Sequence, residues 1–174
     1  NAILALQFMN EDSALEVAKA DERVDQAFDA FNIQEIRTPL LESTDLFDRS
    51  VGNSSDIVNK ELYSFLDRNQ ESVSLRPEGS ASVIRAIIQK KQEHEKHKLW
   101  YQGPMFRYER PQKGRYRQFV QCDIDIIGDD SVLAEIELLN ASLAALDALG
   151  LSKAVIRVNH RELLLSLLDS FGVK

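Results

Sequence analysis

The sequence predicts an α+β fold in which helices flank an antiparallel sheet. Short runs with a period of two alternate with longer stretches of helical spacing, but without a regular βαβ order. Neighbouring strand-like runs are separated by polar turn residues, which favours antiparallel pairing. The chain has 174 residues, enough to bury a core as one domain without a disulfide or a metal.

Composition excludes several classes of protein. Hydrophobic residues make up 44% and charged residues 28%, as in an ordinary globular domain. The single cysteine, Cys122, excludes an intrachain disulfide and a multi-cysteine zinc site, so we expect it to fill the core and predict no metal site. The net charge of −7 argues against a broad nucleic-acid-binding face. No membrane span or targeting segment is evident, so we expect a cytoplasmic protein.

The N-terminal half predicts two helices and three strands. A capping box at Ser13 and Glu16 begins a helix that extends to about Phe31. A strand is expected at 36–41, and Pro39 places it at an edge or an interface. Runs at 62–66 and 72–75 predict a hairpin, and a helix is expected after Pro77.

The C-terminal half predicts three strands and two helices. Residues 99–108 and 117–127 are expected to form an antiparallel pair around a polar loop. A helix follows from Ser131 to Leu149, with Gly150 as its stop. One of its faces carries Val132, Ile136, Leu139, Leu143 and Leu146. A strand is expected at 154–158, followed by a last helix that Asn159 caps and Gly172 closes.

The polar loop concentrates positive charge in an acidic chain. Residues 106–119 carry five cations, Arg107, Arg110, Lys113, Arg115 and Arg117, against one carboxylate, Glu109. Arginine forks suit phosphate oxygens, and the flat rings of Tyr116 and Phe119 could stack on a base, which suggests a nucleotide. A solvated hairpin tip explains the charge density equally well.

The strand after the loop alternates between polar and apolar residues. Gln121, Asp123 and Asp125 follow Phe119 on one face, whereas Val120, Cys122, Ile124 and Ile126 form the other. The polar face could hold a small cationic molecule beside a phosphate. An exposed sheet face would produce the same pattern.

A third segment, Leu75-Arg76-Pro77-Glu78-Gly79-Ser80, ends a strand and begins a helix. Glu78 near a helix N-terminus is favoured by the helix dipole and needs no ligand to explain it.

Together these segments resemble the histidyl-tRNA synthetase family of class II aminoacyl-tRNA synthetases. Residues 106–119, with Leu99-Trp100-Tyr101 and Gly103-Pro104-Met105, are similar to motif 2, which would cover about 99–127. Residues 75–80 resemble the family's Leu-Arg-Pro-Glu-Gly-Thr segment. Motif 1 would cover about 20–42 and implies a homodimer interface. The resemblance extends from about Glu35 to Val173, too long for a chance match.

The resemblance implies a role for each residue of the ATP site. Arg107 would be the catalytic residue and would bind the α-phosphate of ATP and the carboxylate of histidine. Glu109 would contact the adenine amino group, and Phe119 would stack on the adenine ring. Arg115 would hold the outer phosphates, with Tyr116 lining the loop.

The resemblance also implies a histidine site. Glu78, Gly79 and Ser80 would meet the ammonium group, while Gln121 and Asp125 would hold the amino group and the imidazole. The expected reaction joins histidine to ATP as histidyl-adenylate, with Mg²⁺, and then transfers histidine to tRNA(His). Such chemistry needs cations that position the reactants rather than a protein nucleophile.

Parts of the family pattern are missing between residues 1 and 174. These residues lack the Leu-Val-Arg-Gly-Leu-Asp-Tyr-Tyr segment, motif 3 and the anticodon-binding domain, so we expect a partial catalytic domain. The first ten residues lack the family's usual opening. Ser80 stands where Thr is usual, Tyr108 where His is common, and Asp125 where some members have Glu.

Two further functional hypotheses remain open. The chain could be a non-catalytic relative, such as the regulatory subunit of ATP phosphoribosyltransferase, although the complete loop at 109–116 speaks against it. A pure dimerisation module would leave the five loop cations unexplained.

Overall fold

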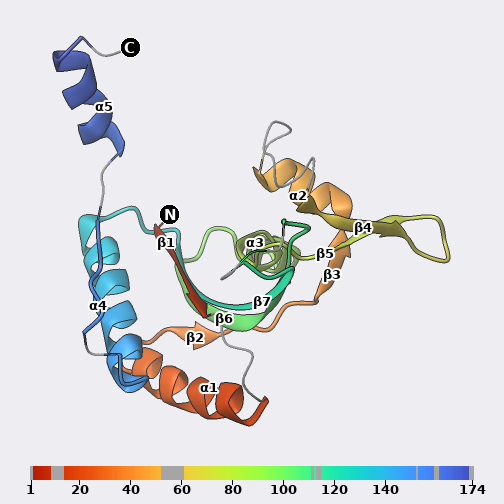
Figure 1. Ribbon diagram of the computed structural model, residues 1–174, viewed down its shortest axis with the longest axis horizontal. Coiled ribbons are helices and arrows are strands. Elements are labelled where there is room, and N and C mark those ends of the chain that lie inside the picture. The colour runs from red at the N-terminus through yellow and green to blue at the C-terminus, as the bar shows by residue number, and fades with distance from the viewer. Residues whose placement is uncertain are drawn as a thin grey trace.

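A four-stranded sheet forms the centre of the chain, in the order β1-β7-β6-β2 (Figure 1). The computed structural model describes residues 2–8, 14–51, 61–110, 112, 115–151, 153–158 and 161–172. The strands are β1 (Ala2–Phe8), β7 (Gln118–Ile127), β6 (His97–Phe106) and β2 (Gln34–Glu35). β7 is antiparallel to both β1 and β6, and β2 runs parallel to β6. The predicted α+β class is confirmed.

A smaller sheet lies beside the first and has the order β3-β5-β4. It consists of β3 (Leu41–Ser43), β4 (Tyr63–Leu66) and β5 (Ser72–Leu75), with α2 (Thr44–Val51) next to it. Asp67 Oδ1 accepts hydrogen bonds from the backbone of Asn69 and Glu71 and so closes the β4–β5 turn. The predicted hairpin is confirmed.

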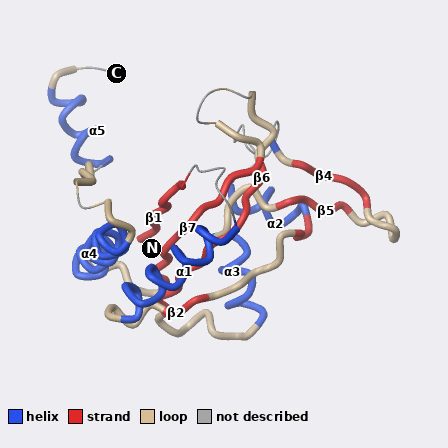
Figure 2. The backbone as a smooth tube through the Cα atoms, turned by 60° about the horizontal axis from the view of Figure 1, so that its bottom comes forward, coloured by secondary structure: helices blue, strands red, loops and turns tan. Residues whose placement is uncertain are grey.

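Two helices cover the apolar face of the large sheet (Figure 2). These are α1 (Ala14–Asp29) and α4 (Val132–Ala148). Phe28 of α1 meets Trp100 of β6 edge to face, with ring centroids 5.3 Å apart. Cys122, Ile124 and Ile126 of β7 complete this core, as the alternation predicted. Cys122 is buried, which confirms its expected place.

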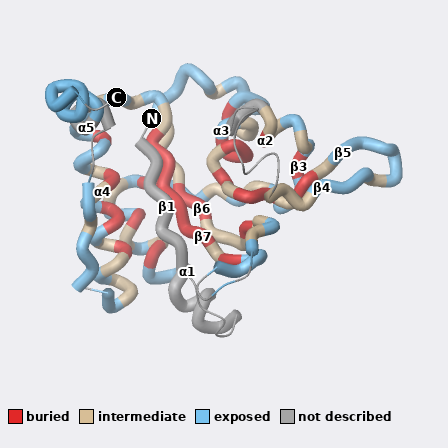
Figure 3. The backbone as a smooth tube through the Cα atoms, turned by 45° about the horizontal axis from the view of Figure 1, so that its top comes forward, coloured by how far each residue is buried: buried red, intermediate tan, exposed pale blue. Residues whose placement is uncertain are grey.

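The opposite face of the sheet packs against α3 (Ser80–Gln89). Val83 and Ile87 of α3 contact Tyr101 and Met105 of β6 and Phe119 of β7. Both faces of the central strands are therefore covered, and the buried residues concentrate there, whereas the tip of the β4–β5 hairpin is exposed (Figure 3).

The predicted strand at 36–41 is wrong. β2 ends at Glu35, before the predicted strand, β3 begins at Leu41, its last residue, and residues 36–40 belong to neither strand. Pro39 has no N–H to donate, and the carbonyl of Thr38 accepts from the Arg76 side chain instead of from a neighbouring strand. The edge position was correct, because β2 is the last strand of its sheet.

The helix at 131–149 is confirmed, but the apolar face named from the sequence is not its buried face. The residues that α4 buries are Ala134, Leu138, Ala141, Ser142 and Ala145. Val132, Ile136 and Leu143 are exposed instead, because small residues allow α4 to approach the sheet and α1 closely. Ser131 caps the helix through its side chain, and Gly150 ends it with φ of 80°.

The C-terminal segment departs from its prediction. Residues 153–158 contain no strand, and every one of them except Ile156 is exposed. The expected last helix is present as α5 (Arg161–Ser170), and Gly172 follows it with φ of 69°. The proposed caps Ser13 and Asn159 lie outside the described residues.

Two elements were not predicted, β1 and α2. β1 is a short apolar run that cannot be distinguished by periodicity from other buried segments. In the described part of the chain, no helix combines the length and the apolar character needed to cross a membrane.

Candidate functional site

The polar face of β7 is buried rather than solvated. Gln121, Asp123 and Asp125 are 8%, 2% and 1% exposed. In the antiparallel register, Gly103, Tyr101 and Leu99 of β6 lie opposite these three residues. An exposed sheet face, the alternative left open by the sequence, is therefore wrong.

Three oxygen atoms on this face have no hydrogen-bond donor among the described residues. They are Gln121 Oε1, Asp123 Oδ1 and Asp125 Oδ2. Burying an acceptor without a donor is unfavourable, so a group of such atoms indicates a place for a molecule with several N–H donors.

A chain of polar contacts connects the two carboxyl groups of this face. Ser80 Oγ donates to Asp125 Oδ1 at 3.2 Å and lies 3.1 Å from the Tyr101 hydroxyl. Tyr101 in turn hydrogen-bonds Asp123. Ser80 and Tyr101 each carry one hydroxyl hydrogen. With Asp123 ionised, both hydrogens go to carboxylates and none remains for the Ser80–Tyr101 contact.

A protonated Asp123 resolves this shortage of hydrogens. Asp123 would then donate to Tyr101, Tyr101 to Ser80, and Ser80 to Asp125, which gives each contact one hydrogen. Burial, followed by the charge of Asp125, raises the pKa of Asp123 to about 7. Burial also raises the pKa of Asp125, to about 6, and raises the pKa of Tyr101 well above its usual range. Of the two carboxyl groups in the chain, Asp123 therefore has the higher pKa, close to neutrality.

The start of α3 lies against Tyr101 because residue 79 has no side chain. A Cβ built on Gly79 would lie 2.0 Å from Tyr101 Cε2. Glu78 turns its carboxylate back onto the helix and accepts from the backbone N–H of Ala81 at 3.1 Å. Burial raises the pKa of Glu78, while the backbone hydrogen bonds from Ala81 and Ser80 and then the charges of Arg107 and Arg76 lower it in part.

Arg107 enters the site from the end of β6. Its Nε donates to the carbonyl of Pro77 at 2.9 Å, and its Cζ lies 5.1 Å from the centroid of the Phe119 ring. Within the described part of the chain, the guanidinium is thus held by a carbonyl dipole and a ring face rather than by an ion pair with a carboxylate. Such a cation can bind an incoming anion.

The loop after Arg107 holds the other predicted nucleotide contacts. Arg115 Nη1 lies 3.4 Å from Glu109 Oε2, and the backbone of Arg115 bridges to Gln112. Tyr116 is 41% exposed, whereas Phe119 is buried at 7%. Arg117 stacks on Tyr108, 4.1 Å from the ring centroid. The described residues of the loop are thus largely exposed and are connected to one another by these contacts.

The structure brings most of the predicted residues to one place. Ser80 and Asp125 are hydrogen-bonded, Gly79 touches Tyr101, and Arg107 reaches Pro77 beside Glu78. Sequence reasoning assigned no role to Tyr101 or Arg76. The signal for Tyr101 was its position opposite Asp123 in the strand pair, which is visible only once the register is known.

The comparisons with known proteins decide the family. The family profile described as "Histidyl-tRNA synthetase" matches residues 5–174. The chain belongs to the histidyl-tRNA synthetase family. The resemblance noted in the sequence is confirmed.

Curated relatives of the histidyl-tRNA synthetase family are similar over most of this chain. It is 47% identical over 137 residues to the histidine–tRNA ligase of Francisella philomiragia, covering 78% of this chain and 32% of the relative. It is 51% identical over 129 residues to that of Prochlorococcus marinus strain MIT 9515, covering 74% and 30%. The chain thus spans about a third of the length of the curated relatives that it matches.

Solved structures of the histidyl-tRNA synthetase family give the same fold. The apo S. aureus histidyl-tRNA synthetase has a TM-score of 0.65 at 32% identity, over 83% of this chain and 33% of that one. A Bacillus halodurans protein described as an ATP phosphoribosyltransferase regulatory subunit/histidyl-tRNA synthetase has a TM-score of 0.63 at 27% identity, over 83% and 37%.

Proposed function

We propose that this chain carries the ATP and histidine sites of a histidine–tRNA ligase. The observation that carries the proposal is the group of buried acceptor oxygens on β7, which share one sheet face with Phe119, the ring beneath Arg107. Histidine presents an ammonium group, an imidazole N–H and a carboxylate. Its donors complement the acceptors of β7, and its carboxylate complements Arg107.

The histidine site would surround the polar groups of the substrate with several residues. Gln121 and Asp125 would accept from the amino group and the imidazole. Glu78, Gly79 and Ser80 would surround the ammonium group, with Glu78 supplying the charge. Asp123 adds a further acceptor that the sequence hypothesis did not assign to histidine.

The ATP site would lie on the loop side of Arg107. Phe119 would stack on adenine beside Arg107, whose Cζ lies 5.1 Å from the centroid of the ring. Glu109 would accept from the adenine amino group, and Arg115, now 3.4 Å from Glu109, would turn to the outer phosphates. Tyr116 would line the loop. We expect Mg²⁺ to arrive with the nucleotide, because phosphate oxygens supply most of its ligands.

The reaction would be an in-line displacement at the α-phosphorus of ATP. A carboxylate oxygen of histidine forms a bond to phosphorus while the bond to the β-phosphate oxygen breaks, releasing pyrophosphate and leaving histidyl-adenylate. Arg107 would hold both the α-phosphate and the carboxylate and so align them while it neutralises the developing charge. In the whole protein, the adenylate would then pass histidine to tRNA(His).

The chain would form part of a class II catalytic domain, with motif 1 at about 20–42 and motif 2 at about 99–127. We also propose a homodimer through motif 1. Leu40 and Leu41 support it, because they are 40% and 47% exposed at the end of this segment. Sedimentation equilibrium giving only the monomer mass at high concentration would refute the dimer.

Histidine-dependent exchange of labelled pyrophosphate into ATP tests the proposal. We expect exchange, or at least binding of both ATP and histidine, with loss of ATP binding in Arg107→Ala. Arg68→Ala is the matched control, because it removes the same charge from an exposed hairpin turn. An unchanged ATP affinity in Arg107→Ala would reject the assignment of the nucleotide site.

A regulatory, non-catalytic role is the second candidate. The likeness to the Bacillus halodurans protein, whose description includes an ATP phosphoribosyltransferase regulatory subunit, supports it. The same assays distinguish the two roles, because a histidine sensor would bind histidine without needing Arg107-dependent ATP binding.

A further inference from the structure

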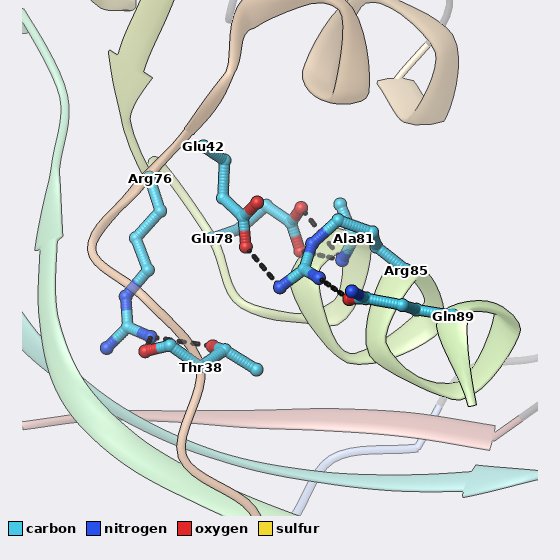
Figure 4. A network of polar contacts seen from close by, with 7 residues as sticks. All are labelled: Thr38, Glu42, Arg76, Glu78, Ala81, Arg85 and Gln89. Atoms are coloured by element: carbon cyan, nitrogen blue, oxygen red, sulfur yellow. Dashed lines mark hydrogen bonds and ion pairs between the residues drawn. The ribbon is translucent and has the colours of Figure 1, made fainter.

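Arg76 is a buried cation that ties two separate segments together. It is 3% exposed and lies at the end of β5, between residues 38–40 and β6. Its Nε donates to the carbonyl of Pro104 at 3.1 Å, and its Nη1 donates to the carbonyl and the hydroxyl of Thr38 at 3.3 and 3.0 Å. Figure 4 shows the guanidinium turned toward Thr38, away from Glu42 and Glu78.

The backbone of Arg76 repeats the same connection. Its N–H donates to the carbonyl of Leu40 at 2.9 Å, and its carbonyl accepts from the N–H of Phe106 at 3.0 Å. Residue 76 therefore holds 38–40 on one side and 104–106 on the other, through both its main chain and its side chain.

Arg107 is fixed at the end of this connection. Its backbone follows Phe106, and its Nε donates to the carbonyl of Pro77, the residue after Arg76. The backbone of Arg107 thus follows a residue that is hydrogen-bonded to Arg76, and its guanidinium is hydrogen-bonded to the residue after Arg76.

The cost of burying Arg76 argues for a specific role. No carboxylate of the described residues lies within ion-pair distance of Arg76, and burial lowers the pKa of its guanidinium. An apolar side chain of similar length would avoid this desolvation. Only a planar fork of N–H donors can reach the carbonyls of Pro104 and Thr38 at once. Gly103 makes room for it, because a Cβ there would lie 2.4 Å from Arg76 Nη2.

We propose that Arg76 is a positioning residue, which sets the location of Arg107 and links it to the segment around Thr38. A role of Arg76 in the reaction rests on the function proposed above. Since that segment belongs to the proposed dimer interface, Arg76 would connect the interface to the nucleotide site without touching the nucleotide.

The test compares Arg76→Met and Thr38→Val with Arg85→Met. Arg85 is a suitable control because its ion pair with the buried Glu42, 2.8 Å long, makes it structurally important. Among the described residues, its side-chain hydrogen bonds go to Glu42 and Gln89 and none goes to Thr38 or β6. The first measurement is the side-chain Nε–H signal of Arg107 in ¹H–¹⁵N spectra, assigned by its loss in Arg107→Lys. The second is ATP affinity.

We expect Arg76→Met to speed hydrogen exchange at Arg107 Nε at least about tenfold and to weaken ATP binding about tenfold or more. Thr38→Val should change the hydrogen exchange and the ATP affinity in the same direction but by less. Arg85→Met should change neither quantity by more than about twofold, even if its melting temperature falls. Thr38→Val also serves if Arg76→Met does not fold.

An unchanged Arg107 signal in a folded Arg76→Met chain would overturn the proposal. Equal losses in Arg85→Met would overturn it too, since Arg76 would then contribute only general stability. If the unmutated chain bound no ATP, the proposed function would fail, but the Arg107 signal would still decide whether Arg76 positions Arg107.

Discussion

The two faces of β7 are equally buried but are satisfied in different ways. On one face, Cys122, Ile124 and Ile126 are surrounded by α1 and α4 and need nothing further. On the other, Gln121, Asp123 and Asp125 keep three oxygens without donors in the described chain. One strand therefore supplies stability through one set of alternate residues and a binding surface through the other. Apolar side chains that are fully packed indicate the core, whereas buried polar atoms without hydrogen-bond partners indicate the site.

The largest expected effect comes from breaking the apolar face. Ile124→Ala should lower the free energy of unfolding by about 2–5 kcal/mol, because Ile124 is 1% exposed and its loss leaves a cavity. Urea denaturation measures the change. A loss below about 1 kcal/mol would mean that the core behind β7 is loosely packed.

Asp123→Asn should remove a stability cost from the polar face. Burial raises the pKa of Asp123 from its ordinary value of 3.8 to about 7, so the folded chain holds a proton that the unfolded chain releases in this window. Stabilisation by this group is therefore present below about pH 4 and is lost as the pH rises to about 7. The amide of Asn can donate a hydrogen bond to Tyr101 at any pH, which an ionised Asp123 cannot.

We expect Asp123→Asn to be more stable than the unmutated chain at pH 8, by on the order of 1–3 kcal/mol, with a smaller fall in stability between pH 4 and 7. Unfolding measured across this range checks it. Asp125 and Glu78 also have raised pKa values, so part of the slope should remain. An identical pH profile in both chains would show that Asp123 titrates normally.

Gly79→Ala tests the contact between the start of α3 and the polar face. The new Cβ would lie 2.0 Å from the Tyr101 ring, so Tyr101 must move and break its contact with Ser80. We expect a loss of about 1–3 kcal/mol in unfolding free energy together with weaker histidine binding by calorimetry. A loss of stability without any change in histidine affinity would show that Tyr101 does not contribute to the histidine site.

Ser80→Ala should give the smallest effect, a loss of about 1 kcal/mol, because it removes the hydroxyl that donates to Asp125. Ser82→Ala is the matched control on the same helix. Ser82 Oγ is buried and has no hydrogen-bond partner among the described residues, so its removal should be neutral or stabilising. Equal losses of unfolding free energy in both variants would show that the hydrogen bond from Ser80 to Asp125 does not stabilise the chain.

The sequence predicted the parts of the fold that depend on local pattern. The β4–β5 and β6–β7 pairs, α3 and α4 follow from alternation, turn residues and caps. The failures arose where a distant partner decides the structure. Thr38 does not belong to the expected strand, because its carbonyl accepts a hydrogen bond from Arg76. α4 buries its small residues, because they allow it to pack closely against α1 and the sheet.

The site was predictable to a similar degree. The polar face of β7 followed from alternation, but spacing left open whether that face is buried or solvated, and the structure shows that it is buried. The role of Arg107 came only from the family resemblance. Tyr101 could not be assigned without the register of β6 and β7, and Arg76 could not be assigned without its contacts across 28 and 38 residues of sequence.

The position of β1 beside β7 has a consequence for the order of folding. Ala2 pairs with Ile126 at one end of the ladder and Phe8 with Val120 at the other. β1 therefore cannot pair until β7, the strand of this sheet that comes last in the sequence, has formed. The β6–β7 hairpin closes a short loop and should form early, whereas docking β1 closes a loop of more than a hundred residues and has the larger entropy cost. On a ribosome, β1 would emerge long before its partner, and the sheet would gain its outer strand only after residue 126 had left the exit tunnel.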